Sequence, residues 1–440
     1  MNKPVLVAGG GLAGAQAAIR LANRGIKVDL YEMRPQKETG AHVSGNFAEF
    51  VCSNSLGSID ESNASGELKK ELSMLGSELL QAAYDAQVPA GGALAIDRKV
   101  FSENITSIIE NHPNINIFRE ELTEIPTDRV VLIATGPLTS EKLSLEIQKL
   151  SGKEHFFFFD AIAPIVEKSS INFDKAFFAN RYDKGDSCYI NCPMDKEEYL
   201  NFYNILTNAP KIELKFFEKK SKFFESCLPI EVLASRGVDT LRFGPMKPVG
   251  LVDKRTNKQN WAVVQLRRDD KADTLYNLVG FQTNLKWGAQ KELVHSIPGL
   301  ENANIVRYGV MHRNSFINSP EILHPTLQTK LNPNIFFAGQ LTGTEGYTEA
   351  VMSGLVAAIN IERYLTDRDL IVFPEETMIG ALLGYITAPH KNLQPINSNW
   401  GIVKEMELDK KTRRDKKLKT KLLSERGSEI LNSLISEQHP

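Results

Sequence analysis

Residues 4–32 read PVLVAGGGLAGAQAAIRLANRGIKVDLYE, the pattern of a strand, a glycine turn, a helix and a second strand. The apolar run 5–7 precedes Gly9, Gly11 and Gly14, which stand at GxGxxG spacing. In dinucleotide-binding folds one such glycine permits a tight turn, the second lets the backbone approach a pyrophosphate, and the third lets the helix pack on the strand. The stretch therefore predicts a dinucleotide site in a parallel α/β fold.

The residues of this turn have separate predicted roles. We expect a helix from Leu12 to about Asn23 whose first amides face the phosphates. Glu32 ends the second strand, where a ribose hydroxyl needs an acceptor. The predicted cofactor-binding residues are Gly9, Gly10, Gly11, Leu12, Ala13, Gly14 and Glu32.

The later part of the chain favours FAD over NAD. Residues 334–340, NIFFAGQ, form an apolar strand that runs into a glycine, and a helix rich in small residues is expected at 350–359. A late strand and helix of this kind commonly return to the N-terminal unit in two-domain flavoproteins. Residues 130–136, VVLIATG, predict one more strand of the same sheet.

The organisation of the chain predicts a Rossmann-like FAD-binding domain, glutathione-reductase-like, interrupted by an inserted α+β domain. We place the discontinuous FAD-binding domain at 1–150 and 330–440 and the insertion at 151–329, where the sequence becomes rich in apolar strands. Helices are expected at 66–83 and 98–110 in the first domain, and at 196–206 and 273–278 in the second.

Composition indicates a globular enzyme of the reducing cytoplasm. The chain has 440 residues, 42% hydrophobic and 24% charged, and no apolar run approaches a membrane span of about 20 residues. The N-terminus enters a strand at once, so no signal peptide is expected. Four cysteines are too few for a disulfide scaffold at this size. Cys188 and Cys192 lack a second pair or a spaced histidine, so no metal site is predicted.

Three residues are candidates for chemistry. Cys227 lies between the aromatic pair at 223–224 and Pro229, and it is either a core residue or a reactive thiol. Cys52 lies in a polar loop, where exposure favours reactivity. Tyr347 has a ring that can stack on a planar cofactor. Residues 410–421 carry eight Lys or Arg and one Asp, which indicates either a solvated helix surface or a patch that contacts phosphates.

Taken together, these segments resemble the folate- and FAD-dependent tRNA (uracil-5-)-methyltransferase family, TrmFO, formerly called Gid. The resemblance extends to about residue 400 and is carried by many separate motifs. They include GGGLAG at 9–14, FAEFVCSNSLGS at 47–58, VPAGGALAIDR at 88–98, FFESCLPIEVLASRG at 223–237, FGPMKPVGL at 243–251 and AGQLTGTEGYTEA at 338–350.

The resemblance implies an activity. In this family a one-carbon unit from 5,10-methylenetetrahydrofolate passes through reduced FAD to carbon 5 of a uridine, position 54 of the tRNA T-loop, with NAD(P)H as reductant. It also implies that Cys227 is the nucleophile, and that Cys52 is a second functional cysteine that either accepts a proton or guards the flavin adduct. Tyr347 is implied only as a ring-stacking residue.

Other functions stay open at this point. Some members of the family act on 23S rRNA, so rRNA is the alternative target. A sister activity on wobble uridines would require a longer C-terminal helical domain. A non-enzymatic RNA-binding flavoprotein is a third possibility, and the presence of Cys52 and Cys227 argues against it.

Overall fold

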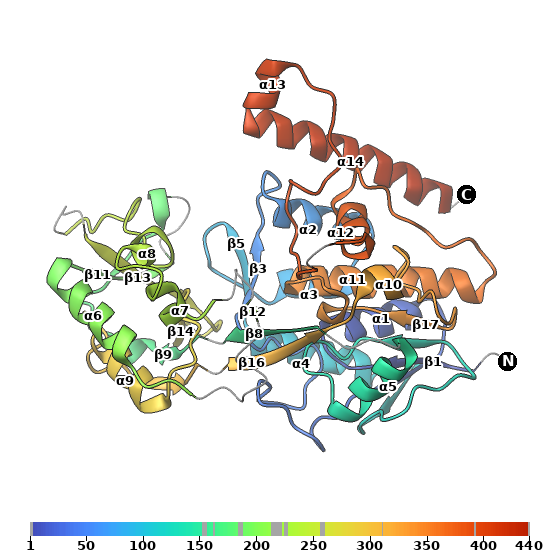
Figure 1. Cartoon of the computed structure of the whole chain (residues 1–440), viewed down its shortest axis with the longest axis horizontal. Helices are drawn as coiled ribbons and strands as arrows, with labels where there is room; N and C mark the ends of the chain where they lie inside the picture. Colours follow the sequence, from blue (N-terminus) through green and yellow to red (C-terminus); the bar gives the residue numbers. More distant parts are fainter. Residues whose placement is uncertain are drawn as a thin grey trace.

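The structure is a computed structural model that describes residues 3–151, 156–161, 163–183, 188–212, 222–223, 228–255, 260–309, 311–390 and 393–438. Figure 1 shows two units side by side. Both ends of the chain belong to the larger unit, and its middle part forms the smaller unit, coloured green to yellow.

The larger unit is built on a parallel sheet of five strands in the order β17-β7-β1-β2-β6. The strands are β1 (Val5–Ala8), β2 (Val28–Tyr31), β6 (Ile115–Phe118), β7 (Val131–Ile133) and β17 (Ile335–Phe337). Parallel strands covered by helices on both faces are apolar throughout, and β1 is entirely buried. The late strand β17 joins this sheet because Phe336 pairs with Leu132.

Helices surround this sheet, and a small antiparallel sheet lies beside it. The helices are α1 (Leu12–Asn23), α2 (Ala64–Met74), α3 (Glu78–Asp85), α4 (Arg98–Glu110), α5 (Glu141–Ser151), α10 (Ser319–Ile322), α11 (Tyr347–Leu365), α12 (Met378–Thr387), α13 (Lys410–Arg414) and α14 (Lys416–Gln438). The small sheet has the order β3-β5-β4 and consists of β3 (Ser55–Ser58), β5 (Ala93–Ile96) and β4 (Gln87–Val88). The buried residues Leu423 and Leu431 of α14 pack into the same core as β1.

The smaller unit is a six-stranded antiparallel sheet with helices and a core of its own. Its order is β10 (Phe177–Phe178), β11 (Ile190–Met194), β13 (Ala262–Arg268), β14 (Leu275–Leu278), β9 (Ile165–Glu167) and β15 (Ile305–Arg307). Its helices are α6 (Lys196–Asn208), α7 (Ile230–Ala234), α8 (Thr240–Phe243) and α9 (Trp287–His295).

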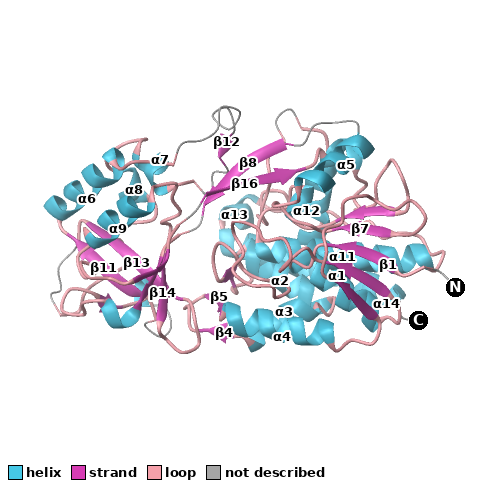
Figure 2. Ribbon diagram, turned by 90° about the horizontal axis from the view of Figure 1, so that it is seen from below, coloured by secondary structure: helices cyan, strands magenta, loops and turns pink. Residues whose placement is uncertain are grey.

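Two antiparallel strands connect the units. β8 (Phe156–Ala161) pairs along its whole length with β16 (Met311–Phe316), and β12 (Lys222–Phe223) pairs with β8. Figure 2 shows β8 and β16 between the two groups of elements. Ile317 and Leu327 already belong to the core of the larger unit. We therefore propose that the insertion ends near Phe316, earlier than the boundary at 329 expected from sequence.

The predicted fold class is confirmed: a parallel α/β unit of Rossmann type carries an inserted α+β unit. The helices predicted at 12–23 and 98–110 are present. The helix predicted at 66–83 is two helices, because Gly76 takes a positive φ of 69° and Ser77 caps a new helix through Leu80 N. The helix predicted at 273–278 is wrong, since β14 pairs there with β9 and β13. No helix among the described residues is long and apolar enough to cross a membrane.

Candidate active site

A cavity of about 430 Å³ opens at the carboxyl ends of β1, β7 and β17. Its wall combines the start of α1, the turn after β7, the start of α11 and the loop that holds Cys52. A smaller cavity beside it is lined by Gly9 and Glu32, and Thr135 and Leu138 belong to the walls of both cavities. The two cavities are thus neighbours, and both lie at the edge where parallel α/β folds bind nucleotides.

The glycine turn leaves room for a ligand at one position and for none at another. A Cβ on Gly14 would lie 1.8 Å from the carbonyl oxygen of Gly9, so helix and turn touch directly there. A Cβ on Gly11 would meet nothing within 4 Å, because Gly11 faces the cavity. Gly11 is the N-cap residue of α1, so the helix has no side-chain cap, and its first turn contains no acidic residue. Its free amides suit an anion such as a pyrophosphate.

Glu32 lies directly after β2 in the wall of the smaller cavity. Its carboxylate accepts hydrogen bonds from Gly10 N at 2.9 Å and from Arg34 N and Nε at 3.0 Å. Burial favours the neutral acid, but the charge and hydrogen bonds of Arg34 and the Gly10 amide outweigh it and hold the pKa of Glu32 below its usual range. A carboxylate can accept about four hydrogen bonds, so capacity for a ribose hydroxyl remains.

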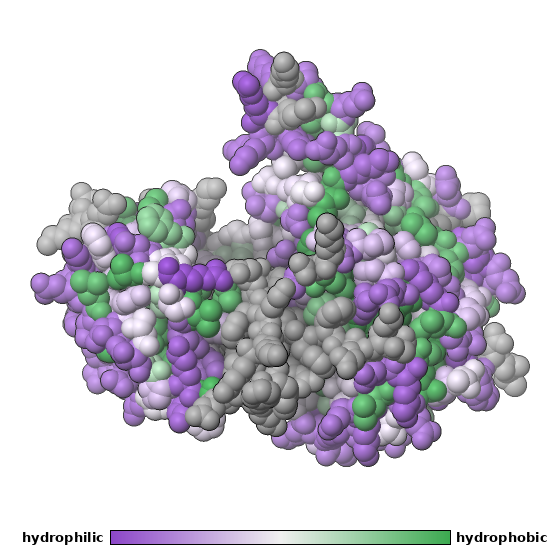
Figure 3. All heavy atoms as spheres, in the orientation of Figure 1, coloured by the Kyte–Doolittle hydropathy of each residue, from purple (hydrophilic) through white to green (hydrophobic). Residues whose placement is uncertain are grey.

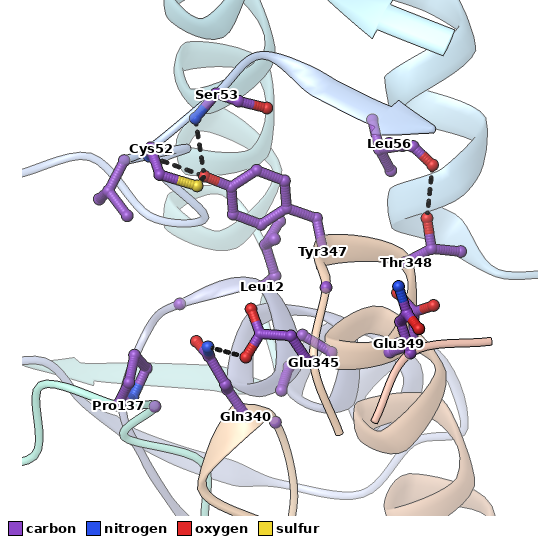
Figure 4. Close-up of a pocket in the computed structure, with 18 of the residues that line it drawn as sticks. Leu12, Cys52, Ser53, Leu56, Pro137, Gln340, Glu345, Tyr347, Thr348 and Glu349 are labelled. Carbon is purple, nitrogen blue, oxygen red and sulfur yellow. Dashed lines mark hydrogen bonds between the residues drawn. The ribbon is translucent and has the colours of Figure 1, made fainter. Parts of the chain in front are cut away.

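Cys52 and Tyr347 meet in the wall of the main cavity, as Figure 4 shows. The Tyr347 hydroxyl oxygen lies 2.9 Å from Cys52 Sγ. It accepts hydrogen bonds from Cys52 N at 2.8 Å and from Ser53 N at 3.2 Å. A hydroxyl has two acceptor sites and one proton. Because two amides fill both acceptor sites, Tyr347 donates its proton to the sulfur.

The tyrosine is held in its protonated form. Burial raises the pKa of Tyr347 well above its ordinary value, and the neighbouring Cys52 raises it further. Its ring packs against Phe50, with ring centroids 4.2 Å apart and planes inclined by 53°. A protonated hydroxyl directed at Sγ stabilises the thiolate form of Cys52 through a charge-assisted hydrogen bond. The structure thus gives Tyr347 a polar role toward Cys52 as well as a ring in the cavity wall.

A buried ion pair joins the two units close to this pair. Arg98, the first residue of α4, binds the carboxylate of Asp269 in the inserted unit, and their side chains are 12% and 6% exposed. Burial favours the neutral form of Arg98, but Asp269 outweighs it and, with smaller contributions from Tyr347 and Cys52, raises the pKa of Arg98. A second contact between the units runs from Arg267 Nε to Asn54 Oδ1 at 3.0 Å.

The remaining candidates are placed as follows. Cys227 lies outside the described residues. Cys188 and Cys192 are buried in the inserted unit as free thiols, and burial raises the pKa of both. Sequence patterns missed His42 and Ser398, which line the main cavity, and only the folded chain brings them there.

Known proteins resemble this chain along most of its length. A family model described as glucose inhibited division protein A matches residues 4–369. A methylenetetrahydrofolate–tRNA-(uracil-5-)-methyltransferase TrmFO of Anoxybacillus flavithermus is 54% identical over 434 residues, 98% of this chain and 99% of the relative. The TrmFO of Bacillus subtilis is 54% identical over 416 residues, 94% of this chain and 95% of the relative.

The chain belongs to the TrmFO family. Among solved structures, a GidA from Aquifex aeolicus superposes with a TM-score of 0.70 at 19% identity, covering 98% of this chain and 74% of that one. At this identity the likeness concerns the fold alone, and it agrees with the parallel α/β fold described above.

Proposed function

We propose that this chain is a methylenetetrahydrofolate- and FAD-dependent tRNA (uracil-5-)-methyltransferase that forms 5-methyluridine and uses NAD(P)H as reductant. The observation that carries the proposal is the main cavity, whose wall contains both Gly11 of the glycine turn and the Cys52–Tyr347 pair. Its relatives of 54% identity bear the name of this activity and of a tRNA substrate. That name favours tRNA over rRNA.

The residues present fit FAD. The open space at Gly11 and the uncapped start of α1 suit the pyrophosphate, and Glu32 suits the ribose of the adenosine half. The start of α11 faces the main cavity, and this helix also lacks a side-chain cap. When bound, FAD supplies the redox chemistry and the carrier for the one-carbon unit. The protein supplies the binding site and the acid–base groups.

Two thiols divide the covalent chemistry in this proposal. Carbon 5 of uracil is a weak nucleophile until a thiolate adds to carbon 6, which turns the ring into an enolate. We assign that thiolate to Cys227, on the family pattern. After carbon 5 has gained its substituent, its proton must leave and the bond from sulfur to carbon 6 must break. The hydrogen bond from Tyr347 keeps Cys52 ready to accept that proton.

The proposal is tested by incubating the purified protein with a tRNA transcript, methylenetetrahydrofolate and NADPH and measuring 5-methyluridine by mass spectrometry. We expect a yellow protein that methylates one uridine of the T-loop. Cys227→Ala should retain FAD and lose methylation, whereas the control Cys188→Ala, a buried cysteine of the inserted unit, should keep both.

A tRNA that contains 5-fluorouridine should trap the wild-type protein covalently, because fluorine cannot leave as a proton does. Full activity of Cys227→Ala, or a trapped peptide that contains Cys52, would reverse the assignment of the two thiols. Methylation of 23S rRNA without methylation of tRNA would overturn the proposed substrate.

A further inference from the structure

The inserted unit has a pocket of its own, separate from the cavity that holds Cys52. We call it the distal pocket and define it by Lys196, Arg242, Phe243, Lys247 and Trp261. Its volume is about 620 Å³. These residues come from the start of α6, the end of α8, the loop after α8 and the residue before β13. None of them has a part in the function proposed above.

The distal pocket combines an exposed ring with cations. Phe243 is 80% exposed, the largest exposed fraction among the large hydrophobic residues of the described chain. The Arg242 guanidinium lies 3.7 Å from the centroid of the Trp261 ring, and Lys196 Nζ lies 5.4 Å from the same ring. The exposed ring of Phe243 offers an apolar face on which a planar ligand can stack.

Two acidic side chains near the pocket already have partners within the protein. Asp195 caps α6 by accepting a hydrogen bond from Glu198 N at 2.9 Å, and Asp239 forms an ion pair with Arg242 at 2.7 Å. Among the described residues, the ammonium groups of Lys196 and Lys247 have no ion-pair partner. Asn260 also lines the pocket, and its Nδ2 is buried without a partner in the described part of the chain. The lining thus carries three cationic side chains and one carboxylate, Asp195.

We propose that the distal pocket binds an unpaired nucleotide of the RNA substrate, at a distance from the uridine that is methylated. The base stacks on Phe243, and the phosphates lie against Lys196 and Lys247. Single-stranded RNA is commonly held by this combination, because every base offers a face for stacking and every phosphate a negative charge. The proposal rests on the proposed function, since it takes the substrate to be tRNA.

The position of the pocket suits a large RNA. We call α13 and α14 together the C-terminal arm. Figures 1 and 2 show that α13 is the end of this arm nearer the inserted unit. Figure 3 shows a hollow between that arm and the inserted unit. Lys416, Lys417 and Lys421 of the arm are exposed. In this proposal an RNA in the hollow contacts cations of the arm and extends to the distal pocket of the inserted unit.

The test compares two RNAs, a full-length tRNA transcript and a short hairpin that carries only the T-arm. Phe243→Ala should weaken binding of the full-length tRNA about tenfold or more and raise its KM, while kcat and the methylation of the hairpin stay unchanged. Phe243→Tyr should restore binding, because a phenol stacks as benzene does. Leu200→Ala is the matched control, since Leu200 is a 42% exposed apolar residue of the same unit that does not line the pocket.

A photoreactive p-benzoylphenylalanine at position 243 should crosslink to one unpaired nucleotide outside the T-loop. Unchanged binding of full-length tRNA by Phe243→Ala, an equal loss on both RNAs, or a crosslink in the T-loop would overturn the proposal. A raised KM for NADPH with unchanged RNA binding would show a coenzyme site and would overturn it as well. Failure of the proposed function is distinguishable, because the wild-type protein would then methylate neither RNA.

Discussion

Replacement of Tyr347 by phenylalanine tests whether the tyrosine hydroxyl stabilises the thiolate of Cys52. The substitution keeps the ring against Phe50 and removes the oxygen that lies 2.9 Å from Cys52 Sγ. A hydrogen bond to a charged group contributes about 1.5–3 kcal/mol, and one pKa unit corresponds to about 1.4 kcal/mol. The midpoint of Cys52 ionisation should therefore rise by about one to two pH units.

The assay is the alkylation of flavin-free protein by iodoacetamide over a range of pH, with the Cys52 peptide quantified by mass spectrometry. The midpoint of the pH–rate profile is the decisive quantity, because the rate alone also depends on access to the sulfur. Tyr385→Phe in α12 is the matched control, since this partly buried tyrosine does not line the cavity. A midpoint for Tyr347→Phe equal to that of the wild type would refute the assigned direction of the hydrogen bond.

Three further predictions follow from the same structure. Gly11→Val should give a folded, colourless protein, because a Cβ at this position meets no protein atom within 4 Å and the side chain takes up space in the cavity. Gly14→Val should lose solubility, because its Cβ clashes with the carbonyl oxygen of Gly9. Flavin absorbance and circular dichroism check both variants, and a yellow Gly11→Val would contradict the role of the turn. Neutral replacement of the six Lys and Arg residues between 410 and 417 should weaken RNA binding and reduce its dependence on salt concentration, while flavin content stays constant. An unchanged dependence of RNA affinity on salt would show that this segment is a solvated surface. Burial lowers the pKa of Lys69 to about 8, against a smaller opposing effect of Glu349, so the unfolded chain binds this proton more tightly than the folded chain. The free energy of unfolding of the wild type should therefore rise by up to about 3 kcal/mol between pH 8 and 10.5. Urea titrations of Lys69→Met should lack that rise, and an equal rise in both proteins would show that Lys69 is not the group responsible.

The sequence predicted the elements that its local pattern determines. The strand, turn and helix of 5–23 follow from short-range glycine spacing and apolar periodicity, and the structure reproduces them. The segment 273–278 shows the limit of that approach. Leu275–Leu278 form β14 because β9 and β13 offer hydrogen-bond partners on both sides, which only the tertiary fold supplies.

The candidate site was predictable in part for the same reason. Gly11 and Glu32 are close in sequence, and their spacing predicts a nucleotide-binding site. Cys52 and Tyr347 lie 295 residues apart, so no local pattern could show that the hydroxyl is directed at the sulfur. Arg98 and Asp269, 171 residues apart, belong to different units, and their ion pair exists only after the units have docked.

The connection through β8 and β16 has a consequence for how such proteins diversify. The chain leaves and re-enters the nucleotide-binding unit on neighbouring antiparallel strands, so the whole insertion occupies the place of a hairpin loop. β7 and β17 remain adjacent in the parallel sheet although the insertion lies between them in the sequence. The inserted unit can therefore change in size or surface without altering the register of the sheet that carries the glycine turn.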